Sequence, residues 1–257
     1  MKTAKHESPR AARAIRWSLR QLGFAYFRMQ IGGLEHVPAK GPAIVAGNHP
    51  NVLDGILLLI ISPRPIRFLV VEQLYFHPLM HWAFKATNCI PVYRSRDNNG
   101  DALRAAVEAL EKGQVIGIFP EGTTDDLGQM KAIKRGVGLL ALRTGAPVVP
   151  FGIWGTDIAY PKGRRIPTPM PVSMVFNKPV YFSKTETYPV PEDRLKQTLE
   201  QLRLAILQAR SDTFAYHVSQ LRPWLLKRIQ VALSAFIVWP LAWVLTVTAP
   251  PEPVKSV

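Results

Sequence analysis

The chain has almost none of the features that build a secreted or cysteine-rich scaffold. Of its 257 residues only one is a cysteine, Cys89, which excludes intrachain disulfides and cysteine-based metal clusters. The first apolar stretch is interrupted by Arg13, Arg16 and Arg20, and no secretory signal is expected because such a signal needs an unbroken apolar core. Most of the chain also lacks long uncharged runs, which excludes a transporter with many membrane spans.

Acidic residues are scarce as well. The chain has 18 Asp and Glu against 32 Lys and Arg, so its formal net charge is +14. It is nevertheless 47% hydrophobic and only 19% charged, which excludes a disordered polycation because disorder needs low hydrophobicity. The length suits one large α/β domain with appendages. The basic excess implies an anionic partner: a nucleic acid, an anionic membrane or a phosphorylated substrate.

A first helix is predicted over residues 11–31. Apolar residues such as Ile15, Leu19 and Leu22 recur every three or four positions, and the arginines fall opposite them. Aromatic residues are interleaved, a combination typical of a helix that lies in a membrane interface. The alternative is a helix packed on the core with a solvated basic face. We expect residues 1–35 to form an amphipathic, membrane-associating helix.

Short apolar runs alternate with helical patterns from Gly41 onward. The expected strands are rich in Val, Ile and Phe and bounded by Gly, Pro or Asn; they cover 43–46, 67–71, 90–93, 115–119, 148–153, 172–176 and 180–182. Helices are expected at 53–61, 79–86, 101–111, 135–144 and 192–210. This alternation predicts an α/β fold over residues 36–212, with a mixed, largely parallel sheet flanked by helices.

A run of roughly 20 uncharged residues occupies 229–249, which is close to the thickness of a bilayer's hydrocarbon core. Lys227 and Arg228 precede it, as basic residues do on the cytoplasmic side of a membrane segment. Pro240 also suits a re-entrant anchor, and a buried terminal helix is the alternative. We expect residues 213–257 to be a C-terminal hydrophobic membrane segment with a short tail. The preceding domain would then face the cytoplasm, at the inner membrane if the source is bacterial.

A histidine and an aspartate follow the first expected strand of the domain. His49 and Asp54 are separated by four residues, so the carboxylate can fold back and accept a hydrogen bond from one imidazole nitrogen. That bond fixes the tautomer and leaves the other nitrogen basic, able to remove a proton from a substrate hydroxyl. Such a pair also occurs as a helix cap or a simple polar contact.

Further polar residues follow other strands. Glu121, Gly122 and Thr123 come after the strand at 115–119, and ligand sites in such sheets lie where parallel strands end. A helix cap is the alternative interpretation of this loop. Arg94 follows the strand at 90–93, and Lys134 and Arg135 extend the basic region. Arginine suits phosphate because its planar fork donates two parallel hydrogen bonds.

Together these blocks resemble the glycerolipid acyltransferase superfamily, whose typical member is bacterial 1-acylglycerol-3-phosphate acyltransferase. NH-x4-D stands at 48–54, an arginine block at 90–94, FPEG at 119–122 and a V-P strand at 148–150, with Lys-Arg-Gly at 134–136. The resemblance covers about 41–182. The Asn-His-Pro-Asn form of the first block and the Thr-Asp-Asp that follows FPEG-Thr depart from the commonest versions, which puts the identity of the acceptor in doubt.

The resemblance implies a membrane-associated enzyme that needs no cofactor. It would transfer a fatty acyl group from acyl-CoA or acyl carrier protein to the hydroxyl of a lysophosphatidate or glycerol-3-phosphate-like acceptor in phospholipid synthesis. His49 would be the general base and Asp54 its orienting partner. Substrate binding would fall to Arg94, Glu121, Gly122, Thr123, Lys134 and Arg135. No metal and no acyl-enzyme are implied, so we expect Cys89 to be a buried residue rather than a nucleophile.

Two other functions are compatible with parts of the sequence. A related acyltransferase or transacylase could remodel other lysophospholipids. A basic protein that binds nucleic acid or lipid without catalysis is the non-enzyme alternative, suggested by the net charge. We expect no nucleic-acid partner, because the chain has no recognisable binding module and its basic residues are scattered.

Overall fold

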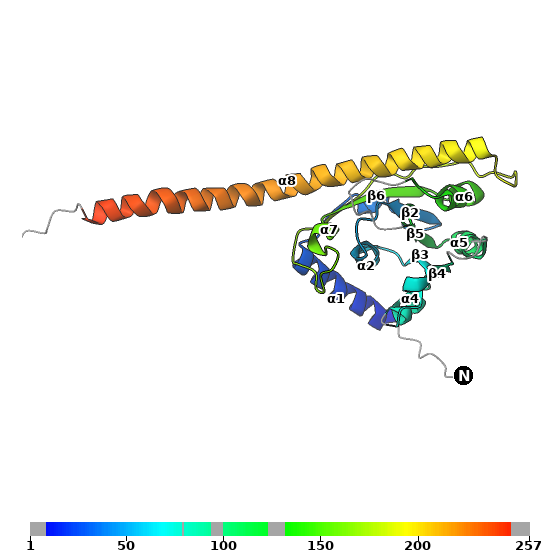
Figure 1. Cartoon of the computed structure of the whole chain (residues 1–257), viewed down its shortest axis with the longest axis horizontal. Helices are drawn as coiled ribbons and strands as arrows, with labels where there is room; N and C mark the ends of the chain where they lie inside the picture. The colour runs from blue at the N-terminus through cyan, green and yellow to red at the C-terminus, as the bar shows by residue number, and fades with distance from the viewer. Residues whose placement is uncertain (1–8, 79, 94–99, 123–131, 248–257) are drawn as a thin grey trace, which may run out of the picture. The chain divides into compact units, whose positions relative to one another are not determined.

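The computed structural model describes residues 9–78, 80–93, 100–122 and 132–247 (Figure 1). Within these ranges, side chains are described only between residues 17 and 220, Leu19 excepted. The chain divides into two compact units, Met1–His217 and Val218–Val257. The first unit contains the sheet, and the rest of this section concerns it.

A seven-stranded sheet forms the centre of this unit. In chain order the strands are β1 (Gln30–Gly32), β2 (Ala43–Gly47), β3 (Ile66–Val71), β4 (Ile90–Val92), β5 (Val115–Ile118), β6 (Val148–Trp154) and β7 (Ser173–Phe176). Across the sheet their order is β1-β7-β6-β2-β5-β3-β4. Neighbouring strands are parallel except β6 and β7, which are antiparallel. The mixed, largely parallel sheet predicted from the sequence is confirmed.

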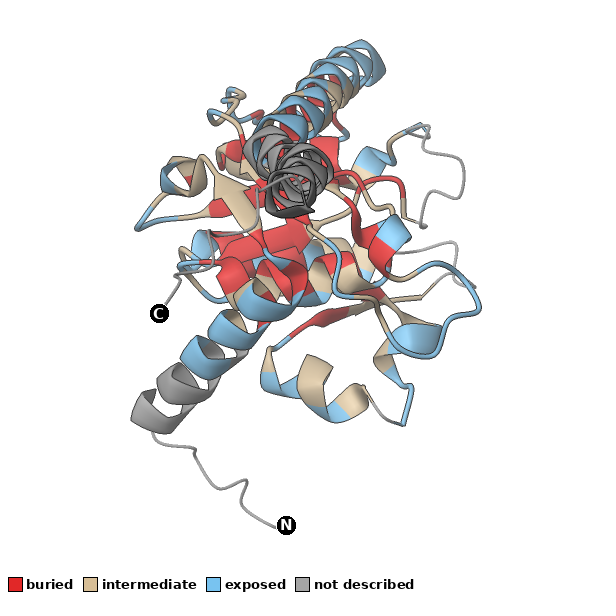
Figure 2. Cartoon of the chain, turned by 90° about the vertical axis from the view of Figure 1, so that its left-hand side faces the viewer, coloured by how far each residue is buried: buried red, intermediate tan, exposed pale blue. Residues whose placement is uncertain are grey.

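Helices cover both faces of the sheet (Figures 1 and 2). The helices of the described residues are α1 (Pro9–Phe27), α2 (Leu53–Ile61), α3 (Glu72–Tyr75), α4 (His81–Ala86), α5 (Gly100–Glu111), α6 (Arg135–Thr144), α7 (Thr156–Ala159) and α8 (Glu192–Val247), with a 3-10 turn at Leu34–His36. Only the part of α8 up to His217 belongs to this unit. The strands they cover are the most deeply buried part of the unit, as Figure 2 shows in red. A strand buried on both faces reads as a continuous apolar run, which is why Ala43–Gly47 shows no polar alternation.

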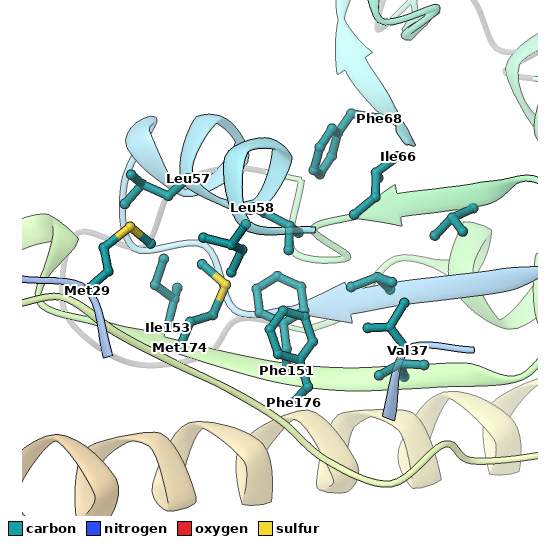
Figure 3. Close-up of a cluster of buried hydrophobic side chains, with 14 of the residues drawn as sticks. Met29, Val37, Leu57, Leu58, Ile66, Phe68, Phe151, Ile153, Met174 and Phe176 are labelled. Carbon is teal, nitrogen blue, oxygen red and sulfur yellow. The ribbon is translucent and has the colours of Figure 1, made fainter. Parts of the chain in front are cut away.

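Alternate residues of the central strand pack into two different cores. Ala43 and Val45 join Leu58 of α2, Phe151 and Phe176 on one face (Figure 3). Ile44 and Ala46 point the other way and pack with residues from α5, α6 and α8, because successive side chains of a strand leave opposite faces. The amphipathic helices α5 and α6 therefore cover one face of the sheet, and α1 with α2 covers the other.

Several element boundaries differ from those expected. The first helix ends at Phe27 rather than at residue 31, since Arg28 has a positive φ of 43° and Gln30–Gly32 pairs with β7 instead. The run at 180–182 forms only an isolated bridge from Val180 to Val148, next to Pro179, which cannot donate a ladder hydrogen bond. The last helix continues well past residue 210, to Val247.

Within the described part of the chain, no helix combines the length and apolar character needed to cross a membrane. The hydrophobic segment at 229–249 lies outside the residues whose side chains the structure describes.

Candidate active site

Three loops meet at one edge of the sheet. β5, β2 and β6 are parallel neighbours, so their carboxyl ends lie side by side. β2 leads into the loop that carries His49, β5 into the loop that carries Glu121, and β6 into α7. The sheet topology therefore brings together segments that are about 70 and 105 residues apart.

The His49 ring and the Asp54 carboxylate form the expected pair. His49 Nδ1 lies 2.9 Å from Asp54 Oδ2, and the same oxygen accepts the Asn51 backbone N–H at 2.8 Å. Because a carboxylate only accepts hydrogen bonds, Nδ1 carries the proton and Nε2 is the basic nitrogen. Asp54 is fully buried in the first turn of α2, while 19% of the His49 side chain is exposed.

Burial dominates the electrostatics of this carboxylate. Removal from water raises the pKa of Asp54, and the hydrogen bond and charge of His49 oppose that rise. Burial therefore raises the free energy of the ionised Asp54 carboxylate, and a positively charged His49 beside it lowers that free energy again. That is the arrangement expected of a group whose task is to stabilise an imidazolium.

Aromatic rings fix the plane of the imidazole. The His49 ring stacks on Phe119, with 4.0 Å between centroids and 14° between planes. Phe119 itself stacks on Phe68 at 5.8 Å and meets Phe151 edge-on at 6.0 Å. Since these contacts start in the core, they transmit the rigidity of the sheet to the His49 side chain.

Two asparagines hold the His49 loop in place. The Asn48 amide donates to the Ile153 carbonyl at 3.1 Å and accepts from the Ile153 N–H at 2.9 Å. Asn51 donates to the Tyr160 carbonyl at 2.6 Å, and its side-chain oxygen accepts the Leu53 N–H at 3.1 Å. The loop is thereby tied to β6 and α7 on one side and to the start of α2 on the other.

The Glu121 loop supports the other side of His49. Glu121 is buried, and its Oε1 accepts the His49 backbone N–H at 3.3 Å. Gly122 has φ 68° and donates to the Phe119 carbonyl at 3.0 Å, a turn that favours glycine. Lys134 donates its N–H to the Pro120 carbonyl at 2.8 Å, and its side chain lies where a Cβ at position 122 would stand.

Five of the residues singled out in the sequence therefore come together: His49, Asp54, Glu121, Gly122 and Lys134. Arg135, by contrast, makes a bidentate pair with Glu192 at 2.9 and 2.8 Å on the surface. Arg94 and Thr123 lie outside the described residues. Cys89 is buried, as expected.

Two features of the site were not found in the sequence. A pocket of about 140 Å³ beside Asn51 is lined by Tyr160, Lys162 and Arg164. Thr156 is fully buried at the start of α7. The only pattern in the sequence that could have indicated it is a hydroxyl residue placed just after a long apolar strand. Among the described residues, no group of three or more His, Cys, Asp and Glu could hold a metal ion.

Known proteins with related sequences share this region. The model of the acyltransferase family matches residues 28–154. A chloroplastic 1-acyl-sn-glycerol-3-phosphate acyltransferase of Brassica napus is 30% identical over 166 residues, which are 63% of this chain and 48% of the relative. The 1-acyl-sn-glycerol-3-phosphate acyltransferase of Pseudomonas aeruginosa is 30% identical over 129 residues, 49% of each chain. The chain spans about half the length of the curated relatives it matches.

A solved structure shares the fold. The crystal structure of the 1-acyl-sn-glycerophosphate acyltransferase of Thermotoga maritima aligns with a TM-score of 0.60 and 27% identity, covering 79% of this chain and 83% of that one. The family match includes the His49–Asp54 pair, the Glu121 loop and the end of β6. The family match over residues 28–154, the curated relatives and the solved structure together support placing the chain in the glycerolipid acyltransferase superfamily.

Proposed function

We propose that this protein transfers a fatty acyl group from a thioester, acyl-CoA or acyl carrier protein, to the hydroxyl of a lysophosphatidate-type acceptor. The observation that carries the proposal is the His49–Asp54 pair at the carboxyl edge of the sheet, at 2.9 Å and held from three sides. The relatives named above act on 1-acyl-sn-glycerol-3-phosphate, which supports this acceptor class.

The proposed reaction needs one base and no covalent enzyme intermediate. Nε2 of His49 takes the proton of the acceptor hydroxyl, and the oxygen attacks the thioester carbonyl. The tetrahedral intermediate then collapses: the C–S bond breaks, the ester forms, and the thiolate leaving group receives the proton from His49. Asp54 stabilises the imidazolium between the two steps, and Glu121 holds the His49 backbone.

Basic residues around the site suit the phosphate of the acceptor. Lys134 reaches Gly122 next to the Glu121 loop, and Lys162 and Arg164 line the pocket beside Asn51. Arg94 and Thr123 complete the proposed substrate contacts. Arg135 would have to leave Glu192 to take part.

We further propose that the reaction takes place at the cytoplasmic face of a membrane, where lysophospholipid acceptors reside. The exposed Trp17 and Leu22 of α1 support this location, because apolar and aromatic side chains beside arginines are what an interfacial helix needs. The hydrophobic run at 229–249 would add a second attachment.

His49→Ala tests the mechanism. Loss of a general base costs about 10²- to 10⁴-fold in rate, so the variant should lose acyl transfer to lysophosphatidate to that extent. His77→Ala is a matched control, because His77 is exposed on the connection between α3 and α4. Assays with acyl-CoA, acyl carrier protein or a diacyl phospholipid as donor distinguish a transferase from a transacylase. Full activity of His49→Ala would exclude the proposed base.

A further inference from the structure

Helix α7 follows β6 (Figure 1), and the residues on either side of it contact the loop that carries His49. Hydrogen bonds join the two segments at both ends: Asn48 binds Ile153 before α7, and Asn51 binds the Tyr160 carbonyl after it. Gly155, with φ 93°, makes the turn between strand and helix. These constraints fix the first residue of α7, Thr156, against the segment from Asn48 to Asp54.

Two polar atoms are enclosed between these segments. Asp54 Oδ1 and Thr156 Oγ1 are both buried, and neither has a hydrogen-bond partner among the described residues. The other carboxylate oxygen, Oδ2, already accepts from both His49 and the Asn51 N–H. A buried polar atom without a partner is uncommon and costs free energy, so two such atoms on segments that are hydrogen-bonded to each other call for a common explanation.

The Thr156 hydroxyl also acts on the Asp54 carboxyl as a hydrogen-bonding group. It lowers the pKa of the carboxyl, as His49 and the Asn51 N–H do, against the rise that burial causes. The two side chains therefore lie close to each other.

We infer that Thr156 is a positioning residue for the His49–Asp54 pair. Its hydroxyl donates a hydrogen bond to Asp54 Oδ1, which leaves Oδ2 directed at His49 while the histidine holds the substrate proton. The inference rests on the proposed acyl transfer, since it assigns Thr156 a place behind the proposed base. The relay then runs from the hydroxyl of Thr156 through the carboxylate to the imidazole.

Other charged groups around the pair come from the loop after β5, the segment before α6, α7 itself and the stretch after α7. Glu121 meets the backbone of His49 from the end of β5, and Lys134 lies against Gly122. Asp157 follows Thr156 on α7 and is exposed, and Lys162 and Arg164 line the pocket beside Asn51. These groups are unchanged in a substitution at Thr156, so a shift in pH dependence reports the lost hydroxyl.

The direction of that shift follows from the charge of the pair. With neutral His49 the pair is an anion, and with protonated His49 it is neutral overall. A donor to the carboxylate stabilises the anion more, so its loss makes the pair bind a proton more readily. In a variant without the Thr156 hydroxyl, the loss of activity that accompanies acidification should therefore begin at a higher pH than in the parent protein.

The test compares Thr156→Val, which has nearly the same shape, with Thr156→Ser, which keeps the hydroxyl. In acyl transfer from acyl-CoA to lysophosphatidate, Thr156→Val should lower kcat about tenfold with KM within about twofold of the parent, because the residue does not touch substrate. The pH of half-maximal activity on the acid side should rise by about one unit. Thr156→Ser should restore both.

Thr213→Val is the matched control, because Thr213 is an equally buried threonine on α8 whose hydroxyl bonds its own helix. If Thr156→Val does not fold, Thr156→Ala against Thr156→Ser makes the same comparison. An unchanged kcat and pH profile in Thr156→Val, or a serine variant as impaired as the valine one, would overturn the inference alone. A parent protein without acyl transfer would overturn the proposed function as well.

Discussion

At the scale of single residues, Asp54 combines a proposed functional task with a cost in stability. The carboxylate is fully buried, and removal from water raises its pKa above the ordinary 3.8. A raised pKa means that the native state binds the proton more tightly than the unfolded chain. Stability therefore falls as pH rises from about 3.8 through the raised pKa of Asp54.

Asp54→Asn should separate the two properties. The amide cannot stabilise an imidazolium, so acyl transfer should fall by about 10²- to 10⁴-fold. Because an amide carries no charge to desolvate, thermal unfolding at pH 7 should occur at the same temperature as in the parent or higher. Asp157→Asn, exposed on the neighbouring helix, controls for the lost charge. A variant that is both inactive and much less stable would contradict this account.

The sequence predicts the His49–Asp54 contact because it is local. The two residues are five positions apart, and the turn before a helix is enough to bring them together. Asn48 and Asn51 bind backbone groups 105 and 109 positions away, and Thr156 meets Asp54 across a similar distance along the chain. Such contacts depend on which strands are neighbours in the sheet, and no pattern within one segment shows that.

At the scale of elements, α8 packs closely on β6. Gly152 is buried in β6, and a Cβ added there would collide with the Ala209 backbone and the Thr213 hydroxyl of α8. The strand and the helix can approach this far only because position 152 has no side chain. The end of β6, which holds the His49 loop through Ile153, depends on that packing.

Gly152→Ala should therefore be destabilising. Overpacking of a tight contact lowers the free energy of unfolding by about 1–3 kcal/mol. The added methyl group would collide with the backbone of α8 at Ala209, which cannot move as a side chain can. Gly136→Ala in α6 is the matched control, since a Cβ there meets no atom within 4 Å; alanine in a helix is favoured by about 0.5–1 kcal/mol. Chemical denaturation of both variants measures the difference. Equal stabilities would show that α8 accommodates the extra methyl group.

A buried polar contact also joins α8 to the sheet. Ser173 Oγ donates to Gln30 Oε1 at 2.7 Å and lies 2.7 Å from His217 Nδ1, so the histidine N–H donates to the serine. Burial lowers the pKa of His217 below the ordinary 6.5, because the protonated ring would lose its hydration.

This histidine should make stability depend on pH. As pH falls through about 6.5, the unfolded chain takes up a proton that the native state refuses, so the free energy of unfolding falls. The decline ends where the lowered native pKa is reached. His217→Asn keeps a donor near the position of Nδ1 and cannot titrate, so its unfolding midpoint should change less between pH 7 and pH 5. Parallel pH curves for the two proteins would count against a role for His217.

The elements that could be predicted are the ones with a strong local pattern. The run at 135–144 is a helix with those bounds, and the central strands lie within a residue or so of their expected limits. β1 was missed because three residues carry no periodicity, and their partner in β7 is more than 140 positions away. The short helices α3 and α7 each span four residues and give no repeat to detect.

At the scale of the whole molecule, the net charge of +14 accompanies exposed apolar side chains. Trp17 and Leu22 of α1 are each 64% exposed, and Trp82 of α4 is 71% exposed. Large apolar groups in water cost free energy unless another apolar phase covers them. An anionic bilayer offers both that phase and charges opposite to those of the protein.

The full-length protein should therefore bind vesicles containing phosphatidylglycerol more tightly than neutral phosphatidylcholine vesicles. Added salt should weaken this binding, because it screens exposed charges. The double substitution Trp17→Ser with Leu22→Ser should reduce co-sedimentation about tenfold or more, since each side chain contributes about 1.5–3 kcal/mol on burial. Tyr181→Ser, 72% exposed on the connection between β7 and α8, is the matched control. Equal losses in the two variants, or equal binding to both vesicle types, would contradict a specific role for α1 at an anionic surface.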